Sequence, residues 1–173
     1  MEPTIYAGDF LLVDKTAYGP SLPFLNIKLW NHGTPERGDI ITFIPPHSSD
    51  LYVKRVVGVP GDNIIIENAN LFINNTRIPQ KLVSSDAKST ILNESLDTVT
   101  HNIKYSTNRP VSSPDLDLVI PENKYFVMGD HRNNSSDSRY WGFVDEDKIM
   151  GKVNRLALSF SSKRAFILSL IRI

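Results

Sequence analysis

Residues 51–62 read Leu-Tyr-Val-Lys-Arg-Val-Val-Gly-Val-Pro-Gly-Asp, and this stretch decides the fold class. It begins with β-branched and aromatic residues, and its closing Pro-Gly-Asp is typical of a turn. Successive side chains of a strand point to opposite faces, so Lys54 shares a face with Tyr52 and Val56, while Arg55 lies on the other. The pattern therefore predicts a strand with one cation on each face.

Similar runs recur along the chain, and the i, i+3, i+4, i+7 spacing of an amphipathic helix is nearly absent. Gly-Asp pairs at 8–9, 38–39, 61–62 and 129–130 indicate turns at strand edges, and Asn74-Asn75 indicates a tight hairpin. The predicted strands cover 10–15, 40–44, 51–59, 64–67, 71–73, 125–128 and 152–160. We expect an all-β fold with few short helices.

The chain has 173 residues, 40% of them hydrophobic, which is enough for one domain with a real core. We predict a core formed by 1–79 plus 122–160. Residues 80–121 are rich in Ser, Thr, Asn, Asp and Pro, so we expect a smaller β-rich insertion of hairpins and loops there. Residues 161–173 form a C-terminal apolar segment in this prediction.

Composition excludes several classes of protein. Nineteen Lys and Arg balance nineteen Asp and Glu, so no sequence-wide attraction to nucleic acid or anionic lipid is indicated. The chain has no cysteine, which excludes disulfides and thiolate metal sites. No run approaches the roughly 18 uncharged apolar residues that span a bilayer.

Lys54 is the first candidate for chemistry. Removal of an ammonium group from water lowers its pKa, and a lysine in such a place can act as a neutral general base. Arg55 cannot take this role because arginine stays protonated. Alternation alone also fits a half-exposed strand on which both cations reach water along their aliphatic stems, and this alternative stays open.

The loop at 129–142 is dense in polar groups and allows three interpretations. A calcium loop fails because Arg132 occupies the third ligand position and no Gly stands at the sixth. A Ser/His/Asp triad of His131, Ser135 and Asp137 is cramped, because triad members usually come from separate elements.

The third interpretation is a rigid loop that supports a catalytic group. Asp137 and Arg139 are placed to pair, and Ser135 could hydrogen-bond a lysine amine and fix its rotamer. A hydrogen-bonded loop without a role in chemistry remains the alternative.

Together these segments resemble the bacterial type I signal peptidase family of Ser/Lys endopeptidases. Residues 1–4, Met-Glu-Pro-Thr, are similar to the family's Ser-Met-x-Pro-Thr box without its serine. Residues 52–62 resemble the lysine box, and 37–41 resemble the box before it. Residues 129–142 match Gly-Asp-Asn-x-x-x-Ser-x-Asp-Ser-Arg-Tyr-Trp/Phe-Gly, with His131 in place of the usual Asn. The resemblance runs from Met1 to about Phe160 and is weakest in the insertion.

The resemblance implies a role for each matching position. Lys54 is the general base, Ser135 orients its amine, Asp137 and Arg139 form a supporting pair, and Arg55 is structural. The positions of Ile5, Tyr52 and Val53 line shallow apolar pockets for small substrate side chains. Neither a metal nor an organic cofactor is implied.

The resemblance also implies that the nucleophilic serine directly precedes Met1, so we expect the sequence as given to lack it and to be inactive by itself. The implied function is removal of signal peptides from exported preproteins. The implied location is the outer, periplasmic side of the bacterial cytoplasmic membrane, reached through an N-terminal anchor. The alternatives are a non-catalytic peptide-binding module and a conjugation-type or self-cleaving Ser/Lys peptidase.

Overall fold

The computed structural model describes residues 1–19, 33–111, 113–159 and 171–172. Within them the fold is mainly β, with three antiparallel sheets, one turn of α-helix and two short 3-10 turns. The strands are β1 (Asp9–Asp14), β2 (Ile40–Phe43), β3 (Tyr52–Gly58), β4 (Asn63–Glu67), β5 (Asn70–Ile73), β6 (Thr76–Arg77), β7 (Gln80–Ser85), β8 (Ser89–Leu96), β9 (Val99–Ser106), β10 (Leu116–Val119), β11 (Lys124–Met128), β12 (Val144–Asp145), β13 (Ile149–Ser159) and β14 (Ile171–Arg172). The short helices are η1 (Arg132–Asn134), α1 (Ser138–Trp141) and η2 (Glu146–Lys148).

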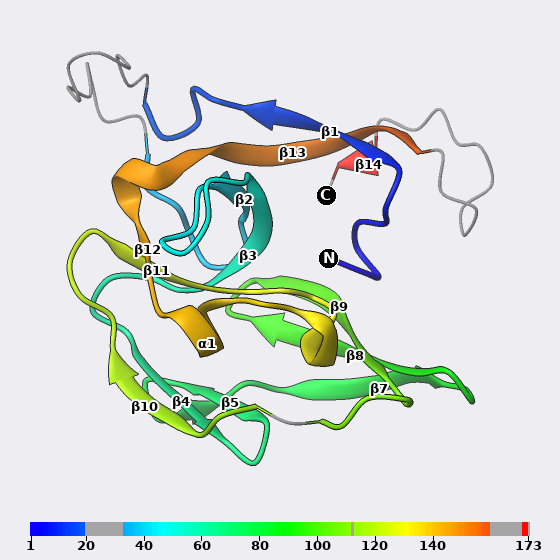
Figure 1. Cartoon of the computed structure of the whole chain (residues 1–173). Helices are drawn as coiled ribbons and strands as arrows, with labels where there is room; N and C mark the ends of the chain where they lie inside the picture. Colours follow the sequence, from blue (N-terminus) through cyan, green and yellow to red (C-terminus); the bar gives the residue numbers. More distant parts are fainter. Residues whose placement is uncertain (20–32, 112, 160–170, 173) are drawn as a thin grey trace.

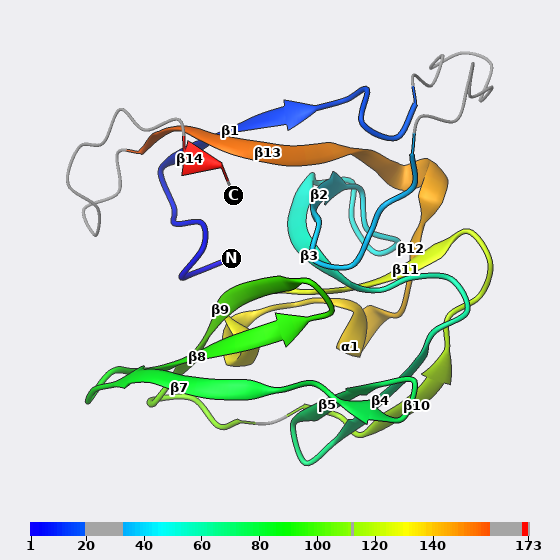
Figure 2. The ribbon, with the colours of Figure 1, turned by 180° about the vertical axis from the view of Figure 1, so that it is seen from behind.

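The largest sheet has seven strands in the order β1-β13-β2-β3-β11-β12, with β14 added at β13. Figure 1 shows β1 and β13 at one side of the molecule, β4, β5 and β10 at the other, and β3 and β11 between them. The view from behind in Figure 2 shows the same arrangement. Strand β3 is therefore central.

The two faces of β3 and β11 serve two different hydrophobic cores. Val56 and Val127 pack with Ile41 and Phe43 in one core, and Val57 and Phe126 pack with residues of β4 and β5 in the other. These four strand residues are fully buried. Strands buried on both faces have no polar face, which explains the unbroken apolar pairs at these positions.

Gly58 allows β3 to lie close to its neighbours. A Cβ at this position would lie 2.5 Å from Ile120 Cδ1 and 2.8 Å from Ile64 Cδ1. Any larger residue would therefore force these two isoleucine side chains to move.

The hairpin predicted at Asn74-Asn75 is confirmed. β5 pairs with β6, and both asparagines have positive φ, 51° and 64°, as expected for a two-residue hairpin turn. These strands belong to a four-stranded sheet with the order β10-β4-β5-β6.

Residues 80–121 contain more strand than the sequence indicated. Three long strands, β7, β8 and β9, form a sheet of their own, and β10 joins the sheet of β4. The division of the chain into a core and an insertion stays a prediction.

The all-β prediction is confirmed, and each of the seven predicted strands coincides with an observed one. The predicted strand at 152–160 begins earlier, at Ile149, and its last residue, Phe160, lies outside the described residues. Of the predicted segment 161–173, only Ile171 and Arg172 are described. Among the described residues no helix has the length and apolar character needed to cross a membrane.

Candidate active site

Lys54 lies on a part of β3 that has an open edge. β3 pairs with β2 through Tyr52 to Arg55 and with β11 through Arg55 to Gly58. On the side of β11, Tyr52, Val53 and Lys54 therefore have no strand partner among the described residues. The chain leaves β11 at Met128, and the loop that follows passes beside Lys54.

Gly129 begins this loop and brings two side chains together. A Cβ at position 129 would clash with Ser135 Oγ and would lie 3.6 Å from Lys54 Nζ. Lys54 Nζ and Ser135 Oγ therefore both lie near Gly129, which has no side chain to separate them. The Tyr52 ring lies on another side, with its centroid 5.7 Å from Lys54 Nζ.

The environment of Lys54 favours the uncharged amine. Burial lowers its pKa from the ordinary 10.5; the carboxylate of Asp137 opposes this shift, the guanidinium of Arg139 adds to it, and Asp130 opposes it. Among the described residues, Lys54 Nζ forms neither an ion pair nor a hydrogen bond. A lowered pKa makes it easier for this amine to lose its proton, as a general base must.

The amino end of Met1 lies close to Lys54. Burial lowers the pKa of the Met1 amino group, and the charge of Lys54 lowers it further. Met1 packs against a small apolar cluster built on Ile5, Ile40 and Val153. In both ribbon views the N-terminus lies between β13 and β9 (Figures 1 and 2).

Asp137 and Arg139 form a buried ion pair within the loop at 129–142. Arg139 Nε donates to Asp137 Oδ1 at 2.7 Å, and Arg139 Nη2 donates to Asp137 Oδ2 at 2.8 Å. Asp137 Oδ2 also accepts from the Gly129 amide at 2.9 Å, which links the pair directly to the backbone beside Lys54.

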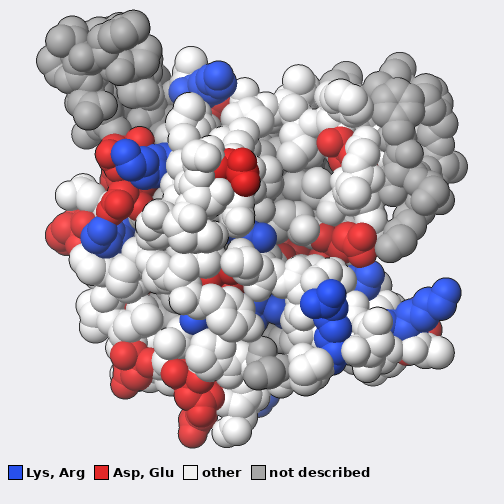
Figure 3. All heavy atoms as spheres, viewed as in Figure 1, with Lys and Arg blue, Asp and Glu red and all other residues white. Residues whose placement is uncertain are grey.

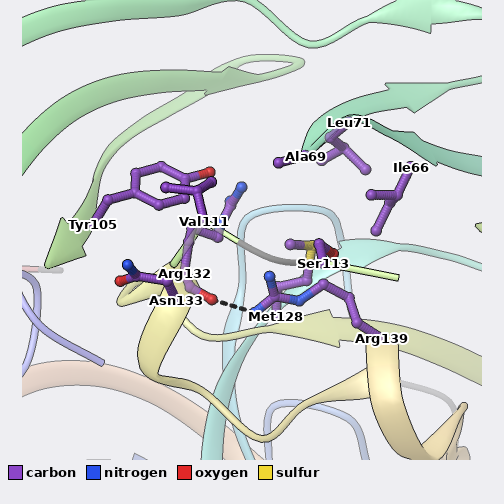
Figure 4. A pocket seen from close by; sticks show the side chains of 10 residues that line it. All are labelled: Ile66, Ala69, Leu71, Tyr105, Val111, Ser113, Met128, Arg132, Asn133 and Arg139. Atoms are coloured by element: carbon purple, nitrogen blue, oxygen red, sulfur yellow. Dashed lines mark hydrogen bonds between the residues drawn. The ribbon is translucent and has the colours of Figure 1, made fainter. Parts of the chain in front are cut away.

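Arg139 also holds the far part of the loop. Its Nη2 donates to the Arg132 carbonyl at 2.6 Å, the dashed contact in Figure 4. The two arginines line a small cavity together with the residues labelled there. Arg132 Nε and Ser113 Oγ are buried and have no hydrogen-bond partner in the described part of the chain. Such groups are commonly satisfied by one buried water molecule.

Arg55 is buried on the opposite face of β3 from Lys54. Its Nε and Nη2 donate to the two carboxylate oxygens of Asp130 at 2.9 and 2.8 Å, and Nη1 donates to the Gly38 carbonyl at 2.7 Å. The Thr4 hydroxyl donates to the same carboxylate. Arg55 is 4% exposed, so the alternative in which both strand cations reach water is wrong for this residue.

Ser135 lies where the sequence placed it, beside Lys54, but the expected hydrogen bond to the amine is not formed in this structure. Its hydroxyl is buried and has no hydrogen-bond partner within the ranges that the structure describes. The role of Ser135 as the residue that orients the amine stays a prediction.

The three predicted pocket residues divide between two apolar clusters. Ile5 and Val53 pack in the cluster that also includes Met1. Tyr52 packs with the other core, where its ring lies 6.3 Å from that of Phe43 and 5.6 Å from that of His47. Two different apolar surfaces therefore flank the open edge of β3.

Sequence reasoning missed several charged residues around the loop. Asp130 appeared only as part of a turn, yet it is fully buried and pairs with Arg55. Glu94, His101 and Lys104 lie in the segment expected to be peripheral, yet they contact the loop or Met1's neighbour Glu2. Glu94 shares a strand face with Leu96, and His101 shares one with Ile103, but this pattern does not identify their charged partners.

Histidine and acidic side chains occur at several other positions among the described residues. No group of three or more His, Asp or Glu side chains among them is arranged to hold a metal ion. Both signs of charge occur across the face seen in Figure 3. His131 is buried, and its Nε2 lies 2.7 Å from Ser106 Oγ.

Comparison with known proteins identifies related chains. The signal peptidase, peptidase S26, family model matches residues 1–157. A signal peptidase I of Pseudomonas aeruginosa is 38% identical over 176 residues, and one of Pseudomonas fluorescens is 36% identical over the same length. Each alignment covers 92% of this chain and 62% of the relative, so the chain spans less than two thirds of their length.

A solved structure of a signal peptidase I from Enterococcus faecalis is 30% identical and superposes with a TM-score of 0.48, covering 70% of this chain and 97% of that one. The family match over nearly the whole described sequence is the deciding finding. The chain belongs to the signal peptidase, peptidase S26, family.

Proposed function

We propose that the complete protein is an endopeptidase that removes N-terminal signal peptides from exported preproteins, with Lys54 as its general base. The observation that carries this proposal is the partly buried amine of Lys54, whose pKa is lowered by burial and which has no ion-pair or hydrogen-bond partner among the described residues, at an open strand edge. Membership of the family and the name of the Pseudomonas relatives, signal peptidase I, support the reaction class.

The nucleophile in this proposal is a serine that directly precedes Met1 in the complete protein. Proximity of the Met1 nitrogen to Lys54 supports this, because a residue attached there starts beside the amine.

Every step of the reaction uses side chains and water. Neutral Lys54 takes the serine proton as the serine oxygen bonds to the scissile carbonyl carbon. The carbon–nitrogen bond then breaks, and Lys54 returns the proton to the departing amine of the mature protein. Lys54 next takes a proton from water, whose oxygen attacks the acyl-enzyme. The bond between the serine oxygen and the carbonyl carbon then breaks, Lys54 returns the proton to the serine oxygen, and the signal peptide is released.

The substrate lies extended along the open edge of β3 at Tyr52 to Lys54, where unpaired backbone groups can add a strand. Small side chains of the signal peptide fit against Ile5 and Val53, which belong to one apolar cluster. Tyr52 bounds the other side of the edge.

The surrounding polar groups hold Lys54 in position in this proposal. Asp137 and Arg139 fix the Gly129 backbone on which the amine rests. Arg55 and Asp130 fix the neighbouring part of β3 and the turn at Thr4. Ser135 orients the amine during the reaction. We place the protein at the outer face of the bacterial cytoplasmic membrane, held by a preceding anchor.

The test compares three proteins with a purified preprotein as substrate: the chain from Met1, the chain extended upstream through the serine, and the extended chain with Lys54→Ala. Cleavage by the extended chain alone is expected. Activity of the extended Lys54→Ala variant would overturn the assignment of the base. Binding of the preprotein by a folded extended chain without any cleavage would favour a peptide-binding module.

Ser135→Ala in the extended chain should reduce cleavage less than Lys54→Ala does, by about tenfold, the effect of one hydrogen bond. A loss equal to that of Lys54→Ala would mean that Ser135 takes part directly in proton transfer.

A further inference from the structure

The β8–β9 hairpin contacts the candidate site at several points, although it lies in the segment expected to be peripheral. The backbone of β9 runs beside the loop after β11: the Lys104 amide donates to the Asp130 carbonyl at 2.8 Å. Further along, the Ser106 amide donates to Asn133 Oδ1, and Asn133 Nδ2 donates to the Ser106 carbonyl, both at 2.8 Å. The loop is thus bound to β9 along its length.

Buried charges fix the hairpin to the loop from inside. Arg132 of the loop pairs with Glu94 of β8 through its two terminal nitrogens, Nη1 and Nη2, and Nη1 lies 2.8 Å from Oε2. His101 of β9 lies between two carboxylates, with its Nε2 3.4 Å from Glu94 and 3.9 Å from Asp130. These groups are at most 8% exposed, so the position of the hairpin relative to the loop is well determined.

From this fixed base, Lys104 reaches the segment next to the expected nucleophile. Its Nζ lies 2.6 Å from Glu2 Oε2, across 102 positions of sequence, and the side chains are 15% and 25% exposed. Glu2 follows Met1, whose nitrogen lies beside Lys54. A partly shielded ion pair therefore joins β9 to the turn that must carry the serine.

We propose that Lys104 is a positioning residue, which through Glu2 sets where the residue before Met1 stands relative to Lys54. The inference rests on the proposed function and adds to it that the 80–121 segment helps to align the nucleophile with its base. A small displacement of reacting groups lowers the rate of the chemical step more than it weakens binding.

The experiment uses the chain extended through the serine and a preprotein substrate, with kcat and KM measured separately. Lys104→Met removes the charge and keeps most of the aliphatic stem, and Glu2→Gln removes the partner charge. Each variant should lower kcat about tenfold with KM nearly unchanged. The double variant should be no slower than either single one, and Lys104→Arg should keep most of the rate.

The matched control is Lys81→Met on the exposed strand β7, which should leave kcat unchanged. An unchanged kcat in folded Lys104→Met would overturn the inference. So would a double variant whose loss of kcat equals the product of the two single losses. Either result means that the two residues do not act through each other. Thermal unfolding of each variant separates these outcomes from loss of fold.

The two proposals fail in different ways. If the extended chain cleaves no preprotein, or cleaves it without Lys54, then the proposed function is wrong and this inference is wrong with it. If cleavage occurs and depends on Lys54 but not on Lys104 and Glu2, only the positioning role is wrong.

Discussion

Two kinds of cation lie in and around the loop at 129–142, and they differ in whether a carboxylate pairs with them. The three buried arginines, Arg55, Arg132 and Arg139, each form a two-point pair with a buried carboxylate. Lys54 lies among them, yet its amine has no ion-pair partner within the described part of the chain, and burial lowers its pKa.

This difference separates cations that fix structure from the cation that can do chemistry. An arginine stays protonated in proteins, so its burial requires a counter-charge, and the pair then holds two elements in register. A lysine can lose its proton when buried, and the lack of a partner makes that loss easier. The following predictions replace Lys54 by an arginine, remove one arginine from its carboxylate, or change the charges around Lys54.

The largest expected effect comes from replacing Lys54 by arginine, the residue type of the three buried, paired cations around it. Lys54→Arg in the serine-extended chain keeps a positive charge but removes the base, so kcat/KM for a preprotein should fall about 10²–10⁴-fold. The control is Lys81→Arg on β7, which should be fully active. Retained activity in Lys54→Arg would mean that deprotonation at this position is not required.

The second prediction breaks a structural pair instead. Arg55→Leu leaves the Asp130 carboxylate buried without its partner, and the free energy of unfolding should fall by about 3–5 kcal/mol. Urea unfolding of the chain from Met1 measures this directly. The matched control is Arg77→Leu on the exposed strand β6, which should change stability by about 0.5 kcal/mol or less. Equal effects at the two positions would contradict the structural role of Arg55.

A smaller effect should appear in the pH dependence. Activity requires neutral Lys54, so kcat/KM should rise with pH through the lowered pKa of that amine. Asp137 raises this pKa and Arg139 lowers it. Asp137→Asn should therefore move the rise to lower pH, and Arg139→Gln should move it to higher pH, in variants shown to be folded. Shifts in the same direction would contradict the charge arrangement around Lys54.

The strands of the central sheet could be predicted because their apolar residues recur in short runs closed by Gly-Asp turns. Val56 and Val57 are an example, since a strand buried on both faces shows adjacent apolar residues. The approach of Lys54 to the loop could be anticipated only from the family resemblance. Nothing in the spacing of residues 54 and 129 says that they meet.

The role of the 80–121 segment could not be predicted for a physical reason. Its buried residues Glu94 and His101 are polar, and in a sequence such residues indicate a solvated strand. Only the fold brings Arg132 and Asp130 close enough to offset their burial. The partners are supplied by a distant part of the chain, so local patterns do not reveal them.

The central claim, that Lys54 is held uncharged more readily than an ordinary lysine, can be tested in the chain as given. The ¹³Cε resonances of its lysines are followed by NMR from pH 6 to pH 12, and Lys54→Arg identifies the signal of Lys54. Our account predicts a midpoint for Lys54 below the ordinary 10.5. A midpoint for Lys54 at or above that of Lys81 would contradict the account.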